Sequence, residues 1–165
     1  MDNSLYEHLV ARQNQMKTRL IKALSITLAL MLAIIAVIFF PTFSLIIIVI
    51  EAVVGYFIFP RFNIEYEYTL LYSDLDIDII YNKAKRKSAN SFDLREAELI
   101  APVTSDRLKL FKPTNTLDYS TQNPNDTPYA IIIPFNKNLT KVLIQPDAKM
   151  IEHLRNAAPR VTFTD

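Results

Sequence analysis

The sequence predicts an α+β membrane protein, in which an N-terminal transmembrane helical hairpin is followed by a small antiparallel β domain with a C-terminal helix. Residues 23–59 form one apolar block, interrupted mainly by Pro41 and Thr42. Beyond Pro60, apolar and polar residues alternate, which is typical of half-buried strands. Residues 147–157 then show helical spacing and are followed by Pro159, a common helix stop.

The apolar block is too long for one transmembrane helix. At about 1.5 Å rise per residue it would form a helix of about 55 Å, nearly twice the ~30 Å hydrocarbon thickness of a bilayer. Two spans, at about 23–40 and 43–59 with a turn at Pro41 and Thr42, fit this length. The block also exceeds the ~7–15-residue core of a cleaved signal peptide, so we expect a permanent anchor.

Charged residues predict the orientation of the hairpin. The cations that flank the block are Arg12, Lys17, Arg19 and Lys22 before it, and Arg61, Lys83, Lys85, Arg86 and Lys87 after it. The turn between the spans carries no charge. Because cytoplasmic loops are enriched in Lys and Arg, we expect a multi-pass protein with both termini in the cytoplasm.

Residues 1–22 are expected to form a cytoplasmic amphipathic leader helix. Ser4 and Glu7 have the spacing of a helix-capping box. The apolar side of this helix would comprise Leu5, Leu9, Met16 and Leu20. The helix would either lie at the headgroup level, with its cations toward lipid phosphates, or simply extend the first span.

Small residues predict close contact between the two spans. They are Ser25, Ala29, Ala33 and Ala36 on the first span, and Ser44, Ala52 and Gly55 on the second. Glu51 shares the second stripe, and an intramembrane carboxyl is costly to keep unless it has a role. Glu51 and Gly55 are therefore candidate contacts within the hairpin or between copies. Proton or ion work, and contact with another membrane protein, remain alternatives for Glu51.

Residues 62–165 are expected to form a cytosolic, mainly β domain. Strands at 64–70 and 75–81 would pair with Leu70 opposite Leu75 across a turn at Leu71–Asp74, because this register matches their apolar faces. Further expected elements are an extended stretch at 92–103, a helical turn at 104–111, a polar loop at 112–128, a hairpin of 129–135 with 140–145, and a helix at 147–157.

The segments 62–68, 75–78 and 82–87 together resemble a family of small, uncharacterised bacterial two-helix membrane proteins. Strands closed by one C-terminal helix also resemble the pleckstrin-homology-like domains that bacteria attach to membrane hairpins. The resemblance implies a bacterial cell membrane and a PH-like cytosolic domain. It implies neither an activity nor phospholipid binding, because such folds carry many functions.

The basic cluster Lys83, Lys85, Arg86 and Lys87 is a candidate lipid-contacting site. The first strand of the domain leaves the membrane and runs about 30 Å, at ~3.3 Å per residue, and the second strand returns. The cluster should then lie at the bilayer surface, where each cation gains ~1 kcal/mol from anionic lipids. Alternatively, the cluster neutralises carboxylates of neighbouring strands or is merely solvated.

No pattern predicts catalysis, a metal site or a cofactor. The chain has no cysteine and a single glycine, which excludes thiol chemistry and glycine-rich phosphate loops. Residues 74–78 begin like a calcium loop, but Ile79 and Lys85 stand where an EF-hand needs Gly and Glu. His8 and His153 lie at opposite ends of the chain. The formal charge of +1 gives no reason to expect nucleic acid as a partner.

These observations predict a non-enzymatic, membrane-tethered cytosolic interaction domain, acting by protein docking or anionic-lipid sensing. Its expected partners are the lipid bilayer, anionic headgroups, and a second copy or another membrane protein. The alternative is an accessory subunit of a membrane transporter or enzyme that uses the carboxyl of Glu51.

Overall fold

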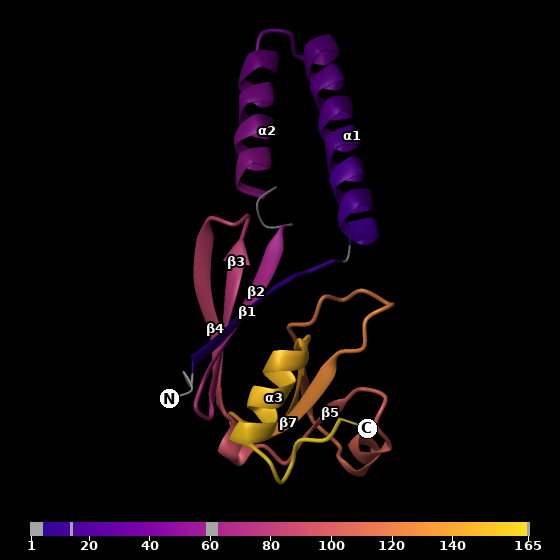
Figure 1. Ribbon diagram of the computed structural model, residues 1–165. Coiled ribbons are helices and arrows are strands. Elements are labelled where there is room, and N and C mark those ends of the chain that lie inside the picture. The colour runs from indigo at the N-terminus through magenta and orange to yellow at the C-terminus, as the bar shows by residue number, and fades with distance from the viewer. Residues whose placement is uncertain (1–4, 14, 59–62, 165) are drawn as a thin grey trace.

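The computed structural model describes residues 5–13, 15–58 and 63–164, and it confirms the predicted α+β class with an antiparallel sheet and a C-terminal helix (Figure 1). The first sheet has the order β1-β2-β3-β4, with strands Leu5–Ala11, Ile64–Leu71, Asp74–Tyr81 and Lys85–Asp93. The second has the order β5-β7-β8-β6, where β5 is Leu99–Pro102, β6 is Asn115–Asp118, β7 is Tyr129–Phe135 and β8 is Asn138–Ile144. The helices are α1 Gln15–Phe39, α2 Ser44–Ile58 and α3 Ala148–Ala157, with 3-10 turns η2 Leu94–Glu96 and η3 Asp106–Leu110.

Helices α1 and α2 are inserted between two neighbouring strands. The chain leaves β1, runs through both helices and returns as β2. Every residue of β1 pairs with β2 in antiparallel register. In Figure 1 the two helices stand side by side and project from one end of the first sheet. One helical stretch, Leu20–Phe39, is long and apolar enough to cross a membrane, and Ser44–Phe57 is a shorter apolar helix.

The predicted leader helix at 1–22 is wrong over Leu5–Ala11, which forms strand β1. The apolar spacing of Leu5 and Leu9 fits a helix, but both side chains are exposed, whereas Tyr6, His8 and Val10 turn toward the protein with a period of two. Pairing with β2 decides the matter, because it supplies hydrogen bonds that a local pattern does not show. Ser4 lies outside the described residues. The β domain therefore includes β1 and does not begin at residue 62.

The hairpin of β2 and β3 has the predicted register. Leu70 lies opposite Leu75, and the turn passes through Tyr72 with a left-handed φ of 55°. Alternation buries Tyr66, Tyr68 and Leu70 on one face of β2, while its acidic residues lie on the other. Matching the apolar faces across the pair thus fixes which side chains face the core.

The segment from 85 to 128 departs from expectation in two places. The predicted extended stretch at 92–103 is divided into the end of β4, the turn η2 and strand β5. The predicted loop at 112–128 contains β6, which pairs in parallel with β8. Only Leu117 of β6 is partly buried, so its sequence lacks the apolar alternation by which strands are recognised. The helical turn expected at 104–111 contains η3.

The C-terminal hairpin and helix form where they are predicted. Strands β7 and β8 pair around a turn at Asn136 and Lys137, both with left-handed φ. Helix α3 begins after Asp147, whose carboxylate caps it by accepting from the Met150 amide at 2.8 Å. Met150 and Leu154, on the side of α3 that faces the core, are fully buried.

The core lies between the two sheets and α3. Its fully buried side chains include Tyr68, Leu70, Leu75, Ile77, Ile131, Ile133, Ile144, Met150 and Leu154. A smaller cluster on the other face of the second sheet joins Leu99, Ala101 and Ile132. β7 is buried on both faces, which explains its nearly continuous apolar sequence.

Among the residues that the structure describes, Tyr68 is the one fully buried residue whose side chain links the two sheets by hydrogen bonds. Its hydroxyl donates to the carbonyl of Tyr119 and accepts from the Gln145 amide at 3.2 Å. Burial raises the pKa of Tyr68, so its hydroxyl stays neutral.

Tyr68→Phe should lower the free energy of unfolding by about 1–3 kcal/mol, because it removes the partner of a buried carbonyl and of a partly buried amide. Chemical denaturation of the full chain in detergent micelles, followed by circular dichroism, measures this loss. Tyr72→Phe is the matched control, since the side chain of Tyr72 is 74% exposed and its change should stay within about 0.5 kcal/mol. Equal effects of the two variants would contradict a structural role for the Tyr68 hydroxyl.

Strand β1 is fastened to α3 through Asp147. The Tyr6 hydroxyl donates to Asp147 Oδ2 at 2.6 Å, His8 Nδ1 lies 3.7 Å from the same oxygen, and the Tyr6 ring stacks on His153. The bond to Asp147 raises the pKa of Tyr6 to about 12. Desolvation raises the pKa of Asp147, but the hydrogen bonds from Tyr6 and the Met150 amide outweigh it, so the pKa lies below its ordinary value.

Tyr6→Phe should destabilise the protein by about 1 kcal/mol at neutral pH. A folded-state pKa above that of the unfolded chain gives stability that is complete below pH 10 and is lost as the pH rises through about 12. The difference between the unmutated chain and Tyr6→Phe should therefore be constant from pH 7 to 10 and shrink above it. Thermal denaturation in micelles across this range measures it. A difference that persists unchanged at pH 12 would show that the phenol does not donate this bond.

Candidate functional site

The candidate site lies at the helix-proximal end of the first sheet, where Ala11, Ile64, Tyr81 and Lys85 stand next to one another in the strand order. β1 and β2 continue from this end toward α1 and α2, and the β3–β4 turn reaches the level of the nearer end of α2 (Figure 1). A site here is built jointly by the sheet and the apolar helices.

A chain of hydrogen bonds links α1 to the β3–β4 turn. Lys22 Nζ donates to Asn63 Oδ1 at 3.1 Å, and Asn63 Nδ2 donates to Asn82 Oδ1 at 3.2 Å. The backbone amide of Asn82 also donates to the Asn63 carbonyl at 2.8 Å. Asn82 has a left-handed φ of 50°, which asparagine tolerates better than most residues. These bonds hold the β3–β4 turn close to the first turns of α1.

The polar loop that follows β6 contacts the connection between β1 and α1. The Gln13 amide donates to the Thr121 carbonyl at 2.7 Å, and Arg12 Nε donates to Gln122 Oε1 at 2.8 Å. Asn123 Nδ2 donates to Gln13 Oε1 at 3.3 Å. In the leader-helix hypothesis Arg12 would turn toward lipid phosphates; in the structure its guanidinium is bound to this loop.

Strand alternation divides the predicted basic cluster between two faces of the sheet. Lys83 and Arg86 lie on the outer face, beside the acidic residues of β2 and β3. Lys83 Nζ is 3.9 Å from Glu65 Oε1, and Arg86 contacts the carboxylates of Glu67 and Asp78. The interpretation that the cluster neutralises neighbouring carboxylates therefore holds for these two cations.

Lys85 and Lys87 lie on the opposite, inner face. They pair across the strands with Tyr81 and Ile79, whose row continues into the buried Ile77 and Leu75. Neither lysine forms an ion pair with any residue in the described part of the chain. Both side chains are exposed, because the apolar core ends before it reaches this end of the sheet.

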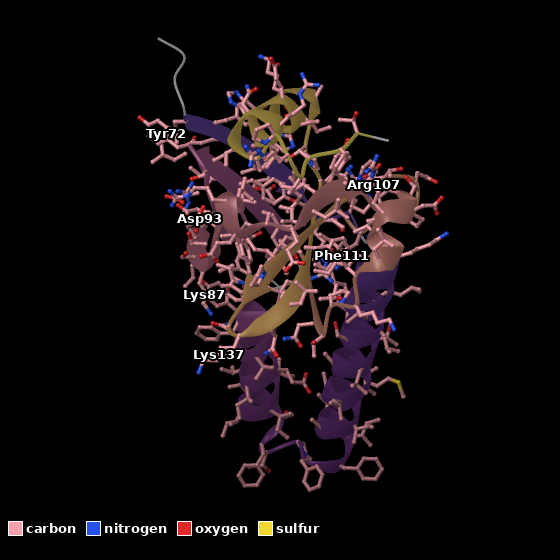
Figure 2. All side chains as sticks on the ribbon, turned by 90° about the horizontal axis from the view of Figure 1, so that it is seen from below. Tyr72, Lys87, Asp93, Arg107, Phe111 and Lys137 are labelled. Carbon is pink, nitrogen blue, oxygen red and sulfur yellow. The ribbon has the colours of Figure 1, made fainter. Side chains whose placement is uncertain are left out.

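A pocket of about 680 Å³ opens between α2 and the β3–β4 hairpin. Its walls are Tyr56 and Phe57 from the last turns of α2, and Tyr81, Asn82, Ala84, Lys85 and Lys87 from the hairpin. Figure 2 shows Lys87 beside the end of the helix, with Tyr72 at the far end of the molecule. The two lysines without acidic partners therefore face an aromatic wall supplied by the helix.

Glu51 and Gly55 lie elsewhere, on the side of α2 that faces α1. The less exposed positions of α2 are Ser44, Ile47, Glu51 and Gly55, and those of α1 include Ser25, Ala29, Ala33 and Ala36. Ala52 is exposed, so it does not belong to the stripe in which it was expected. The structure thus separates the two groups of predicted site residues, with Lys85 and Lys87 at the sheet end and Glu51 within the helix pair.

Sequence reasoning missed Tyr56, Phe57, Tyr81 and Asn82 as parts of a site. The aromatic pair at the end of an apolar block was a usable signal, since aromatic residues gather at membrane–water interfaces. No local pattern could place Tyr81 and Asn82 against them, because that contact spans two elements. Among the described residues, no three His, Asp or Glu side chains come together as a metal site.

Comparison with known proteins places these observations in a family. No curated protein and no solved structure matches the chain. A family model described as "Bacterial PH-like domain (DUF6106)" matches residues 2–164, almost the whole chain, helices included. This match confirms the resemblance seen in the sequence and the PH-like character of the domain. The chain therefore belongs to the bacterial PH-like domain family DUF6106.

Proposed function

We propose that this protein is a membrane-tethered interaction domain, whose helices α1 and α2 cross the bacterial cell membrane as a hairpin and hold the PH-like domain against the cytoplasmic leaflet. The observation that carries the proposal is the insertion of the apolar helices between two paired strands of one sheet. A domain joined to its anchor through two adjacent strands cannot turn freely, so one end of the sheet always faces the bilayer.

The surfaces of the helices support a membrane location. In the apolar stretch Leu20–Phe39 only 6% of the residues are buried, so this is not the core helix of a soluble fold. Both helices present large apolar side chains outward, among them Leu24, Leu28, Ile34, Leu45 and Val49. An exposed apolar surface of this extent is stable in lipid and costly in water.

Leaflet contact is favoured over protein docking as the role of the helix-proximal end. Lys85 and Lys87 lie at this end without acidic partners in the described chain, beside the aromatic end of α2. Cations close to a bilayer are attracted by anionic lipids within a Debye length. A protein partner would instead dock at the far end of the domain, where Leu5, Leu71 and Tyr72 are exposed.

Single cysteines can test the topology, because the chain contains none. A membrane-impermeant maleimide should label Thr42→Cys in intact spheroplasts, and Leu110→Cys only after lysis, since Leu110 lies on the β domain and is 83% exposed. Because β1 and β2 are paired and lie on one side of the membrane, labelling of both from the same side would show that neither α1 nor α2 crosses it. Labelling of Leu110→Cys alone in intact spheroplasts would reverse the proposed orientation.

Glu51 supports a second role within the same proposal, that of stabilising contacts of the hairpin or between copies. Its place on the α1-facing side of α2 favours this over the alternative of an accessory subunit that carries ions. A polar side chain that bonds across helices in lipid contributes about 1 kcal/mol.

Glu51→Gln should leave the thermal stability and the oligomeric mass in detergent unchanged, because an amide of similar shape can also form a hydrogen bond across the helices. Glu51→Leu should lower the stability by about 1 kcal/mol. Differential scanning fluorimetry and size-exclusion chromatography with light scattering measure both. If neither variant changes stability or mass, the contact role is refuted and the accessory role gains support.

A further inference from the structure

The pocket between α2 and the β3–β4 hairpin is lined by residues that lie outside the buried core. Its volume of about 680 Å³ lies within the usual range for small-molecule sites, roughly 300–1,000 Å³. Among the residues that the structure describes, those that line it include two lysines and no carboxylate. The outer face of the same strands, by contrast, balances its cations with Glu65, Glu67 and Asp78. A positive charge left unbalanced on the pocket side alone indicates an anionic ligand.

The two lysines are arranged to hold one phosphate. They are two positions apart on β4, so they point to the same side and their Cα atoms stand about 7 Å apart, at ~3.3 Å per residue. Flexible ammonium groups at this spacing can both reach a single phosphodiester, which lysine binds as a point charge. The neighbouring turn is held in place by the bonds from Lys22 through Asn63 to Asn82.

The opposite wall of the pocket identifies the rest of the ligand. Tyr56 and Phe57 are 76% and 65% exposed and lie edge to face, so their rings present apolar surface that the protein itself does not cover. From these rings α2 continues as an apolar surface toward the hairpin turn. A ligand that satisfies both walls has an anionic head at the lysines and an apolar tail along α2. A soluble phosphate would leave the aromatic wall unused.

We propose that this pocket binds one anionic phospholipid, with its phosphodiester between Lys85 and Lys87 and its glycerol and acyl chains against Tyr56 and Phe57. This inference rests on the proposed function, because only a membrane-spanning hairpin brings the pocket to the level of the headgroups. It adds to that function a defined site with a stoichiometry of one, distinct from diffuse attraction of cations to a charged surface.

Native mass spectrometry of the full chain in detergent, titrated with phosphatidylglycerol or phosphatidylcholine, tests the proposal. One phosphatidylglycerol should bind in preference to phosphatidylcholine. The double variant Lys85→Gln with Lys87→Gln should weaken that binding about 30-fold, since each lysine near a lipid surface contributes a factor of about five. The matched control, Lys83→Gln with Arg86→Gln, removes the same charge from the outer face and should bind almost as the unmutated chain does.

Two further arms separate the sources of phosphate and guard against misfolding. Phe57→Ala, which leaves the sheet untouched, should also weaken phosphatidylglycerol binding, whereas free glycerol 3-phosphate should not displace the lipid. Displacement by glycerol 3-phosphate, or equal losses in the two double variants, would overturn the proposal. The proposal would also be overturned if Phe57→Ala and the Lys85→Gln, Lys87→Gln double variant both bound phosphatidylglycerol as tightly as the unmutated chain.

Failure of this inference is distinguishable from failure of the proposed function. Lipid binding in micelles does not depend on orientation in the cell, which the cysteine labelling of Thr42→Cys and Leu110→Cys reports separately. A correct topology without a bound lipid would refute the pocket alone. A bound lipid with the β domain outside the cell would keep the site and refute the cytoplasmic orientation.

Discussion

The pairing of β1 with β2 is the constraint on which the rest of the structure depends. These strands are separated by more than fifty residues of sequence, and the described residues between them form α1, α2 and short connections. Antiparallel pairing over seven residue pairs brings the start of α1 and the end of α2 to the same end of one sheet. Because strands in a sheet lie about 4.8 Å apart, the helices emerge as neighbours and can pack along their small residues. One set of backbone hydrogen bonds therefore organises both the sheet and the helix pair.

The same pairing gives the domain a fixed direction relative to its helices. The bonds of Lys22 to Asn63 and of Gln13 to Thr121 reinforce it from two sides, one through the β3–β4 turn and one through the loop after β6. A single flexible linker would allow the domain to present any surface to the bilayer. In the proposed arrangement, two short connections from adjacent strands allow only one, and this is where the unbalanced lysines and the aromatic end of α2 meet.

Alternation along β4 explains how one run of basic residues serves two purposes. Arg86, together with Lys83 in the turn, neutralises carboxylates on the outer face of β2 and β3. Without these cations the carboxylates would repel one another. Lys85 and Lys87 point to the inner face at a level where the apolar core has ended. Burial among apolar side chains would be costly for an ammonium, so these positions tolerate lysine only because they open to the pocket.

The sequence by itself determined the features that depend on local period and length. These are the apolar block, the β2–β3 register, the hairpin of β7 and β8, and the helix that follows Asp147. Each depends on residues that are close together in the chain. The tertiary structure alone decided the features that depend on distant partners. Leu5–Ala11 is a strand because β2 is available to pair with it, and β6 is a strand because β8 is. The division of the basic cluster and the joining of Lys85 and Lys87 to Tyr56 and Phe57 likewise come from contacts between elements, for which a single sequence carries no local signal.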